Sequence, residues 1–437
     1  MKKYTRISAA LACATSTLLS PAASQAAEPT EKNNQQPELS PRKGWLDGWA
    51  IDSAFLLYTE PGRVSAVEPV ITARRTTDFG NILTLKGAID VLTGASGTGA
   101  VATDSPQTFT RPSGIGSYVV DAGDTPLDDT FKDTRIAISV DWDAEISRTL
   151  RYGLGASFSG EYDYRSLGIN GRLIKEFNQK NTAVSLSMSV ANDTLNPVGG
   201  VPEALQQISA ANYGSRTKDE KKTVTDVLLG VTQIIDSRSL FQLNYGLTAS
   251  SGYHNDPYKL VSLVDANGRP FDTSATIPSV IYENRPDSRT RHSFFGRYKR
   301  RLGSGNILDA SYRLTTDDWG INSHTLDTKY RWVLSDRQYL QARLRYYTQS
   351  AADFYQPFLL QGQAIPAFAS ADYRVGKMNA ITVGLEYGWG QLATPWRVAI
   401  EYYMQRPSEP AGKFGELLNQ ELAPPVNALM LRLNKTF

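Results

Sequence analysis

The chain has 437 residues, a single cysteine and a formal net charge of +2. Because nucleic-acid binding calls for a basic surplus, we expect no nucleic-acid partner. No stretch of about 18 apolar residues follows the N-terminal segment, and this excludes helical membrane spans. Two classes remain: a secreted soluble β protein and a membrane β-barrel.

The first 26 residues predict export. Met1, Lys2, Lys3 and Arg6 make a basic start, an apolar stretch rich in Ala and Leu follows, and "SQA" at 24–26 fits a small-x-small cleavage site. This order is typical of a secretory signal peptide, here residues 1–26, that is removed before the mature chain begins.

The only cysteine, Cys13, lies within this predicted signal peptide. The motif "ALAC" loosely resembles a lipoprotein cleavage box, but too little apolar sequence precedes it, so we expect no lipidation. The mature chain then has no thiol for a disulfide or a metal ligand, and we expect no cofactor. Residues 27–44 are polar and contain proline, which predicts a flexible periplasmic segment.

Alternation with a period of two is the strongest signal in the chain. From Leu150 to Arg165 the even positions are mostly apolar and end in tyrosines, whereas the odd positions are small, polar or charged. Successive strand residues point to opposite faces, so this segment separates two different environments. The alternating segments run for ten or more residues, and Tyr and Trp gather at the ends of their apolar faces, which favours an outer-membrane barrel over a sandwich.

Strand counting supports an all-β, transmembrane, antiparallel up-and-down barrel over residues 45–437. The expected strands are 47–59, 63–76, 81–93, 134–144, 149–164, 166–178, 182–192, 222–235, 239–252, 290–301, 305–316, 322–334, 338–349, 370–388, 395–406 and 425–437. The connections after even-numbered strands are short, and every long one follows an odd-numbered strand, as in outer-membrane barrels. The total of sixteen depends on taking 370–388 as one strand that alternates through Gly376.

The last eleven residues, "NALMLRLNKTF", predict a strand that closes the ring against the first one. Its apolar residues share one face, which we assign to lipid: Leu429, Leu431, Leu433 and Phe437. A terminal aromatic on such a strand resembles the signal that the outer-membrane assembly machinery recognises. Lys435 departs from that pattern, but a lysine near the periplasmic interface can extend its amine into water.

Five stretches resemble one bacterial family, the domain of unknown function 3570. They are "DVLTGASGTGAV" at 90–101, "YKLVSLVD" at 258–265, "ENRPDSRTRHS" at 283–293, "DDWGINSHTLDTKYRW" at 317–332 and "YYTQSAADFY" at 346–355. The resemblance covers most of the mature chain and implies a Gram-negative outer-membrane barrel. It carries over no catalytic residue.

Charged residues on the polar faces predict a lumen with two unlike walls. The tenth to thirteenth strands direct seven basic residues inward, with Asp309, Asp317 and Asp327 among them: Arg297, Lys299, Arg313, Lys329, Arg331, Arg343 and Arg345. The fourth to sixth strands direct five acidic residues inward, beside Arg151, Arg165 and Arg172: Asp141, Asp143, Glu161, Asp163 and Glu176. In a ring of sixteen these walls face each other.

Two interpretations of these charges remain open. A transverse field would bias a pore between anions and cations, or the charges could pair with their neighbours and merely brace the interior. Sixteen strands can enclose an aqueous channel. The Gly-, Thr- and Ser-rich segment 94–133 is the predicted constriction.

A catalytic or metal site is the remaining possibility. Two of the three histidines, His292 and His324, share faces with apolar residues and point toward lipid, so we expect no enzyme. The run "DDWGINSH" groups Asp317, Asp318 and His324, which predicts either a tight hairpin or a contact to a cation or to lipopolysaccharide.

Three functions follow from these patterns. The first is a porin-like channel for small polar solutes. The second is a plugged barrel that acts as a scaffold or conduit for a periplasmic or surface partner and docks it through 27–44. The third, a hydrolase at the rim, is disfavoured by the orientation of the histidines. The expected partners are outer-membrane lipid, lipopolysaccharide and the assembly machinery.

Overall fold

The computed structural model describes residues 48–111, 116–208, 215–270, 279–391 and 394–437. The predicted signal peptide and the segment 27–44 lie outside these residues. Among the described residues, no helix is long and apolar enough to cross a membrane.

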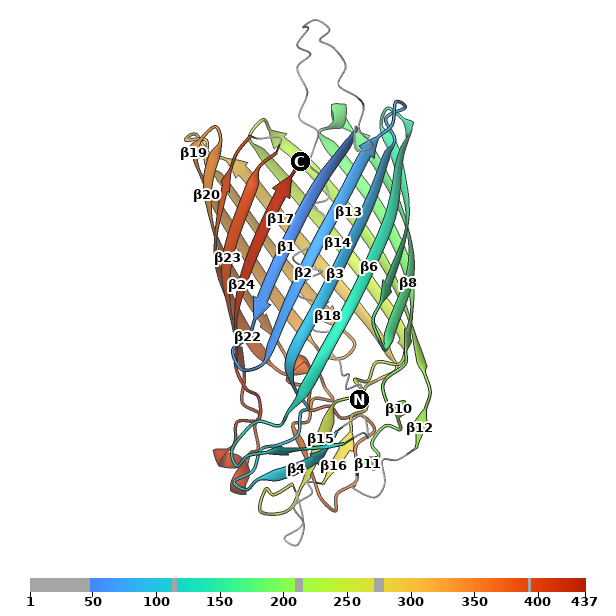
Figure 1. The fold of residues 1–437 in the computed structure, drawn as a ribbon. Coiled ribbons are helices and arrows are strands. Elements are labelled where there is room, and N and C mark those ends of the chain that lie inside the picture. The colour runs from blue at the N-terminus through green and yellow to red at the C-terminus, as the bar shows by residue number, and fades with distance from the viewer. Residues whose placement is uncertain (1–47, 112–115, 209–214, 271–278, 392–393) are drawn as a thin grey trace, which may run out of the picture.

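The described chain forms a closed antiparallel barrel of sixteen strands (Figure 1). In order round the ring the strands are β1 (Trp49–Thr59), β2 (Val64–Thr76), β3 (Ile82–Gly97), β6 (Leu127–Ser147), β7 (Leu150–Gly160), β8 (Tyr164–Phe177), β9 (Thr182–Leu195), β13 (Glu220–Asp236), β14 (Ser239–Gly252), β17 (Ser288–Arg301), β18 (Ile307–Asp317), β19 (Asn322–Ser335), β20 (Gln338–Gln349), β22 (Met378–Trp389), β23 (Trp396–Pro407) and β24 (Val426–Thr436). The predicted fold class and strand number are confirmed.

The ring closes where β24 pairs with β1, from Asp52 opposite Thr436 to Thr59 opposite Leu429. In a bilayer core no water is present to satisfy backbone N–H and C=O groups, so a spanning sheet must have no free edge. The terminal strand therefore serves as the last partner of the first one, as its alternation predicted.

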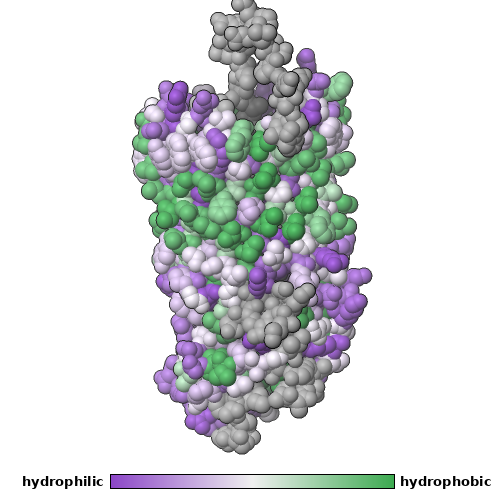
Figure 2. Space-filling view, viewed as in Figure 1, coloured by the Kyte–Doolittle hydropathy of each residue, from purple (hydrophilic) through white to green (hydrophobic). Residues whose placement is uncertain are grey.

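On the face shown in Figure 2, apolar side chains form a belt across the middle of the barrel, between more polar ends. Leu154, Leu167 and Ile169 are 59%, 63% and 66% exposed. In a water-soluble protein, neighbouring large apolar side chains of this kind would be buried in the core. Aromatic rings gather at the short-turn end, where Trp389 stacks on Trp396 at 6.2 Å. A closed ring with such a belt is an outer-membrane protein of a Gram-negative cell.

The end with the long connections faces the outside of the cell. There the loops fold into a compact unit, which we call the cap (Figure 1). It contains a four-stranded sheet in the order β11, β16, β15, β21, and two small pairs, β10 with β12 and β4 with β5. The short strands are β4 (Gln107–Thr110), β5 (Ser117–Val120), β10 (Val201–Pro202), β11 (Gln207–Ile208), β12 (Arg216–Thr217), β15 (Leu260–Val264), β16 (Val280–Tyr282) and β21 (Phe358–Leu360).

Strand β15 is the centre of the cap. Leu260, Val261 and Val264 have no exposed surface, and they belong to three different apolar clusters. The segment predicted as a constriction packs along this strand: Leu260 N–H donates to Thr98 O at 2.8 Å. Between them Gly99, at φ +90°, leaves no room for a side chain, since a Cβ would lie 2.8 Å from Leu260 O. Part of 94–133 thus belongs to the cap.

The single strand predicted at 370–388 is wrong in its start. Residues before Gly376 belong to the cap, where Asp372 N-caps a short 3-10 turn, η2 (Tyr373–Val375), and β22 begins only at Met378. The strand number is unaffected.

Six charged groups, three buried and three largely buried, tie the cap loops together. Arg285 donates to Asp372 at 2.8 Å, and Arg374 donates to both Asp372 and Asp256, the latter at 2.9 Å. Glu283 pairs with Arg285 at 2.7 Å. The sixth, Lys259, donates to the backbone of the 94–101 segment at Gly97 O. Three positive and three negative groups balance, as burial of charge requires.

The pKa values in this cluster follow from burial and from the neighbouring charges. Burial raises the pKa of Glu283 and lowers that of Lys259. Burial alone would also raise the pKa of Asp372, but Arg374 and the other nearby cations hold it well below its usual range. The Asp372 carboxylate is therefore the negative centre that the arginines depend on.

Replacement of Asp372 by Asn should loosen the cap. Two buried guanidinium groups would lose their shared carboxylate, at a cost of about 3–5 kcal/mol. We expect a protease added to the detergent-folded protein to cut the 350–377 loop at concentrations that the unmodified protein resists. The matched control is Glu421→Gln, which removes an exposed carboxylate from another cap loop. Equal resistance of D372N and the unmodified protein would contradict this role.

Candidate functional site

The lumen wall is the candidate functional site, since it carries most of the charged side chains of the barrel. In the ring order β19 lies opposite β6, and β20 lies opposite β7. All seven predicted basic residues lie on the inward face of β17 to β20. The strand register shows this, since Lys299 lies opposite Asp309 and Lys329 lies opposite Arg343. These four strands form the basic wall.

Two arginines of the basic wall bind carboxylates. Arg297 makes a two-pronged pair with Asp309, with Nε 2.8 Å from Oδ1. Arg343 binds Asp327 on β19 and reaches Glu401 on β23 at 3.1 Å. Paired guanidinium groups brace adjacent strands through planar double hydrogen bonds.

The other five basic residues have no carboxylate within 4.0 Å among the described residues: Lys299, Arg313, Lys329, Arg331 and Arg345. Arg331 lies 3.9 Å from the ring centre of Tyr339 and donates to Gln341 at 3.1 Å. Arg313 lies 5.2 Å from the ring centre of Phe295. The wall thus keeps positive charge that its own acids do not neutralise.

Glycines allow ion pairs to pass over an intervening strand. Arg343 and Glu401 meet across β22 at Gly384, where a Cβ would lie 2.7 Å from Glu401 Cγ. On the opposite wall Gly153 of β7 has the same role, since a Cβ there would lie 2.5 Å from Asp143 Oδ1. The small residues on the polar faces therefore have a positional purpose.

The acidic wall is largely satisfied by its neighbours. Asp143 pairs with Arg172 across β7, and Asn170 donates to Asp141 at 3.3 Å. Glu176 lies 3.0 Å from Lys180 at the short-turn end. These three side chains occupy the inward face, where the alternation predicted them.

Glu161 and Asp163 do not line the wall along a strand. They lie in the loop between β7 and β8, at the extracellular mouth, because β7 ends at Gly160. Arg165, the second residue of β8, faces outward opposite Thr194, whereas an inward side chain was predicted. Residues 161–163 lie outside both strands, so alternation does not apply to them. The predicted facing of Glu161, Asp163 and Arg165 was therefore wrong.

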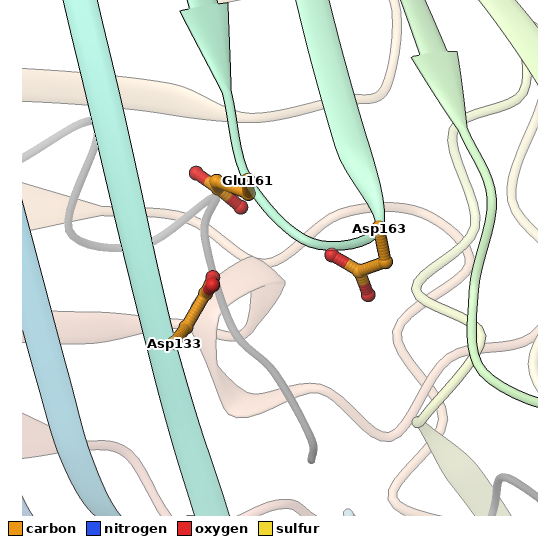
Figure 3. A group of neighbouring side chains, drawn as sticks. All are labelled: Asp133, Glu161 and Asp163. Atoms are coloured by element: carbon orange, nitrogen blue, oxygen red, sulfur yellow. The ribbon is translucent and has the colours of Figure 1, made fainter.

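This loop brings Glu161 and Asp163 toward Asp133 of β6 (Figure 3). One carboxylate oxygen from each lies within 4.8 Å of the other two, and Asp133 is 6% exposed. Three oxygen ligands of this kind suit a hard cation such as calcium. Among the described residues this is the group whose geometry could hold a metal.

The earlier metal candidates do not converge. Asp317 Oδ1 accepts from the backbone of Trp319 and Ile321, at 3.1 and 2.9 Å, and Asp318 accepts from Thr290 N–H. Both carboxylates thus fix the hairpin after β18. His324 lies on the outer face, where its Nδ1 is 2.6 Å from Tyr312 Oη. The hairpin interpretation accounts for all these contacts.

Two acidic residues of β22 and β23 belong to the lumen wall although they were not predicted as site residues. Glu401 binds both Arg343 and Arg432 at 3.1 Å, and Glu386 accepts from Tyr339 at 2.8 Å. Both lie on the inward face of strands whose alternation was recognised. A complete inward list for every strand would have included them.

Comparison with known families decides the affiliation of the chain. A family model described as "Protein of unknown function (DUF3570)" matches residues 8–437. The chain belongs to the DUF3570 family. Three of the stretches that resemble this family, at 90–101, 258–265 and 283–293, supply Gly97, Lys259, Glu283 and Arg285 of the buried charge cluster.

Solved structures similar to this DUF3570 barrel include the siderophore receptor PirA from Acinetobacter baumannii, with a TM-score of 0.40, 8% identity, and coverage of 83% of this chain and 54% of the receptor. A mutant ferric enterobactin receptor from Pseudomonas aeruginosa has a TM-score of 0.42 and 10% identity, and the match covers 89% of this chain and 60% of the receptor. The TodX deltaS2S3 mutant monoaromatic hydrocarbon channel has a TM-score of 0.40 and 9% identity, and the match covers 89% of this chain and 90% of the channel. The chain thus spans little more than half the length of the first receptor. No curated protein sequence matches it.

Replacement of Gly384 by Ala should break the ion pair that crosses β22. The added methyl would displace Glu401 from Arg343, and we expect a loss of about 1–3 kcal/mol of folding stability from the crowded contact. Thermal unfolding in detergent measures this loss. Gly87→Ala is the control, since a Cβ at Gly87 meets nothing within 4 Å. Equal melting temperatures for the two variants would contradict the role of Gly384.

Proposed function

We propose that this barrel is a channel for small polar solutes across the outer membrane, with a preference for anions. The observation that carries the proposal is the basic wall, on which five cations lack a carboxylate partner within the described part of the chain, whereas Asp143 and Glu176 on the opposite wall are paired. An uncompensated positive wall raises the local concentration of anions and lowers the barrier to their passage.

The cap supports a regulated form of this channel. Loops from several strands cover the extracellular mouth (Figure 1), so passage would require either a gap between the loops or movement of the cap. The same observation favours the second candidate, a plugged barrel that serves a periplasmic or surface partner. Current through the reconstituted protein, in the unmodified form or after the cap is loosened by D372N, supports the channel. Absence of current in both forms supports the plugged barrel.

We also propose that the barrel acts without catalysing a reaction. The histidines that face lipid are bound to tyrosines, His292 to Tyr245 at 2.9 Å and His324 to Tyr312. At the mouth, His254 Nε2 is 2.8 Å from Ser250 Oγ, but its Nδ1 faces the carbonyl of Gly252, only two residues away. We interpret this contact as a local brace at the end of β14. Insertion by the assembly machinery through the β24 signal remains part of the proposal.

The ion selectivity of the reconstituted channel tests the proposed function. We expect a reversal potential that indicates anion preference in a salt gradient. The double variant Lys299→Gln plus Lys329→Gln, which removes two unpaired cations, should lower the anion-to-cation permeability ratio by about twofold or more.

The control for this measurement is Arg297→Gln plus Asp309→Asn. It removes a complete ion pair from the same wall without a change in net charge. We expect its selectivity to equal that of the unmodified channel. A cation preference in the unmodified channel, or equal shifts in both double variants, would contradict the proposed anion preference.

A further inference from the structure

A pair of cations lies on the outer face of the barrel at its extracellular end. Arg165 of β8 and Lys221 of β13 both pair with Thr194 of β9, which lies between them. Neighbouring strands are about 4.8 Å apart, so the two cationic side chains start about 10 Å from each other on one row. We call Arg165, Thr194 and Lys221 the rim row.

The cations of the rim row are available for a ligand. Both side chains are exposed, and among the described residues neither has a carboxylate within 4.0 Å. The adjacent Lys222 faces inward and binds Asp193 at 3.3 Å, so strand alternation separates a paired lysine in the lumen from an unpaired one outside. Unlike the lumen cations, Arg165 and Lys221 point away from the pore.

The surface below the rim row changes from polar to apolar along the strands. Next on the outer face come Asn192 and Thr223, whose side chains are joined by a 2.9 Å hydrogen bond. Leu167 lies opposite Asn192 in the same row, and Ile169 follows one row further along β8; both side chains are exposed and apolar. The row thus lies at the upper edge of the apolar belt, at the level where lipid headgroups meet acyl chains.

We propose that the rim row binds the phosphate of an anionic glycolipid in the outer leaflet. An arginine and a lysine whose backbones lie about 10 Å apart can close on one phosphate from two sides, because both side chains are long and flexible. The hydroxyl of Thr194 lies between them as a further polar contact. Acyl chains of the same lipid would cover Leu167 and Ile169, which a soluble phosphate would leave bare.

The test is lipid binding to the detergent-purified full chain. We would titrate it with bisphosphorylated lipid A and with the dephosphorylated form, and follow the melting temperature and the bound lipid by native mass spectrometry. The variant is Arg165→Gln plus Lys221→Gln. The control is Arg75→Gln plus Arg300→Gln, which removes two outward-facing cations at the periplasmic end.

We expect the phosphorylated lipid to bind the unmodified protein and the control equally, and the rim-row variant about tenfold more weakly, as loss of charge-assisted contacts implies. The dephosphorylated lipid should bind all three proteins weakly and alike. Equal binding of phosphorylated lipid to the rim-row variant and the control, or equal binding of both lipids to the unmodified protein, would overturn the proposal. Neither result depends on whether the lumen conducts ions.

Discussion

The structure depends on one constraint: every backbone N–H and C=O group within the bilayer must find its partner in the protein. A sheet meets this requirement only when its last strand pairs with its first. In this chain the pairing of β24 with β1 closes the ring, so that all sixteen strands have two neighbours. Alternation then follows, because each residue of a closed sheet faces either lipid or the lumen.

The inward face holds charge in a way that the outward face cannot. Arg343 and Glu401 meet over Gly384, and Asp143 and Arg172 meet over Gly153. Such contacts tie alternate strands together. The cap differs, because its clustered charges are buried or largely buried and are balanced around Asp372. The lumen wall thus keeps cations without a carboxylate partner among the described residues, whereas the cap uses its charges to hold its loops together.

Periodicity made the barrel predictable. An alternation of ten residues specifies a strand, its two faces and its direction, and the asymmetry of connection lengths specifies the two ends. The seven basic residues were placed correctly because their strands are regular. The errors arose where regular structure stops, since Glu161, Asp163 and Arg165 all follow the end of β7. Side chains alternate between two faces only within a strand, so the alternation of β7 does not predict which way residues point after the loop.

The cap and the ion pairs could not be predicted in the same way. The four strands of its sheet come from three connections, and β15 gains its position only when the segment at Thr98 packs on it. The run "KLVSLV" does indicate a strand buried on both faces, and this signal was available. Pairing within the lumen depends on cross-strand register, which alternation alone does not fix. The same register revealed the rim row.

The central claim is a closed barrel with short turns in the periplasm and a folded cap outside, and thiol labelling of intact cells tests it most directly. A single cysteine would be placed in the cap at Gln363 or in the short turn at Asp336, both exposed, and probed with a maleimide too large to cross a pore. Our account predicts labelling at position 363 and none at 336 until the outer membrane is permeabilised. Labelling of the turn on intact cells, with a protected cap, would contradict it.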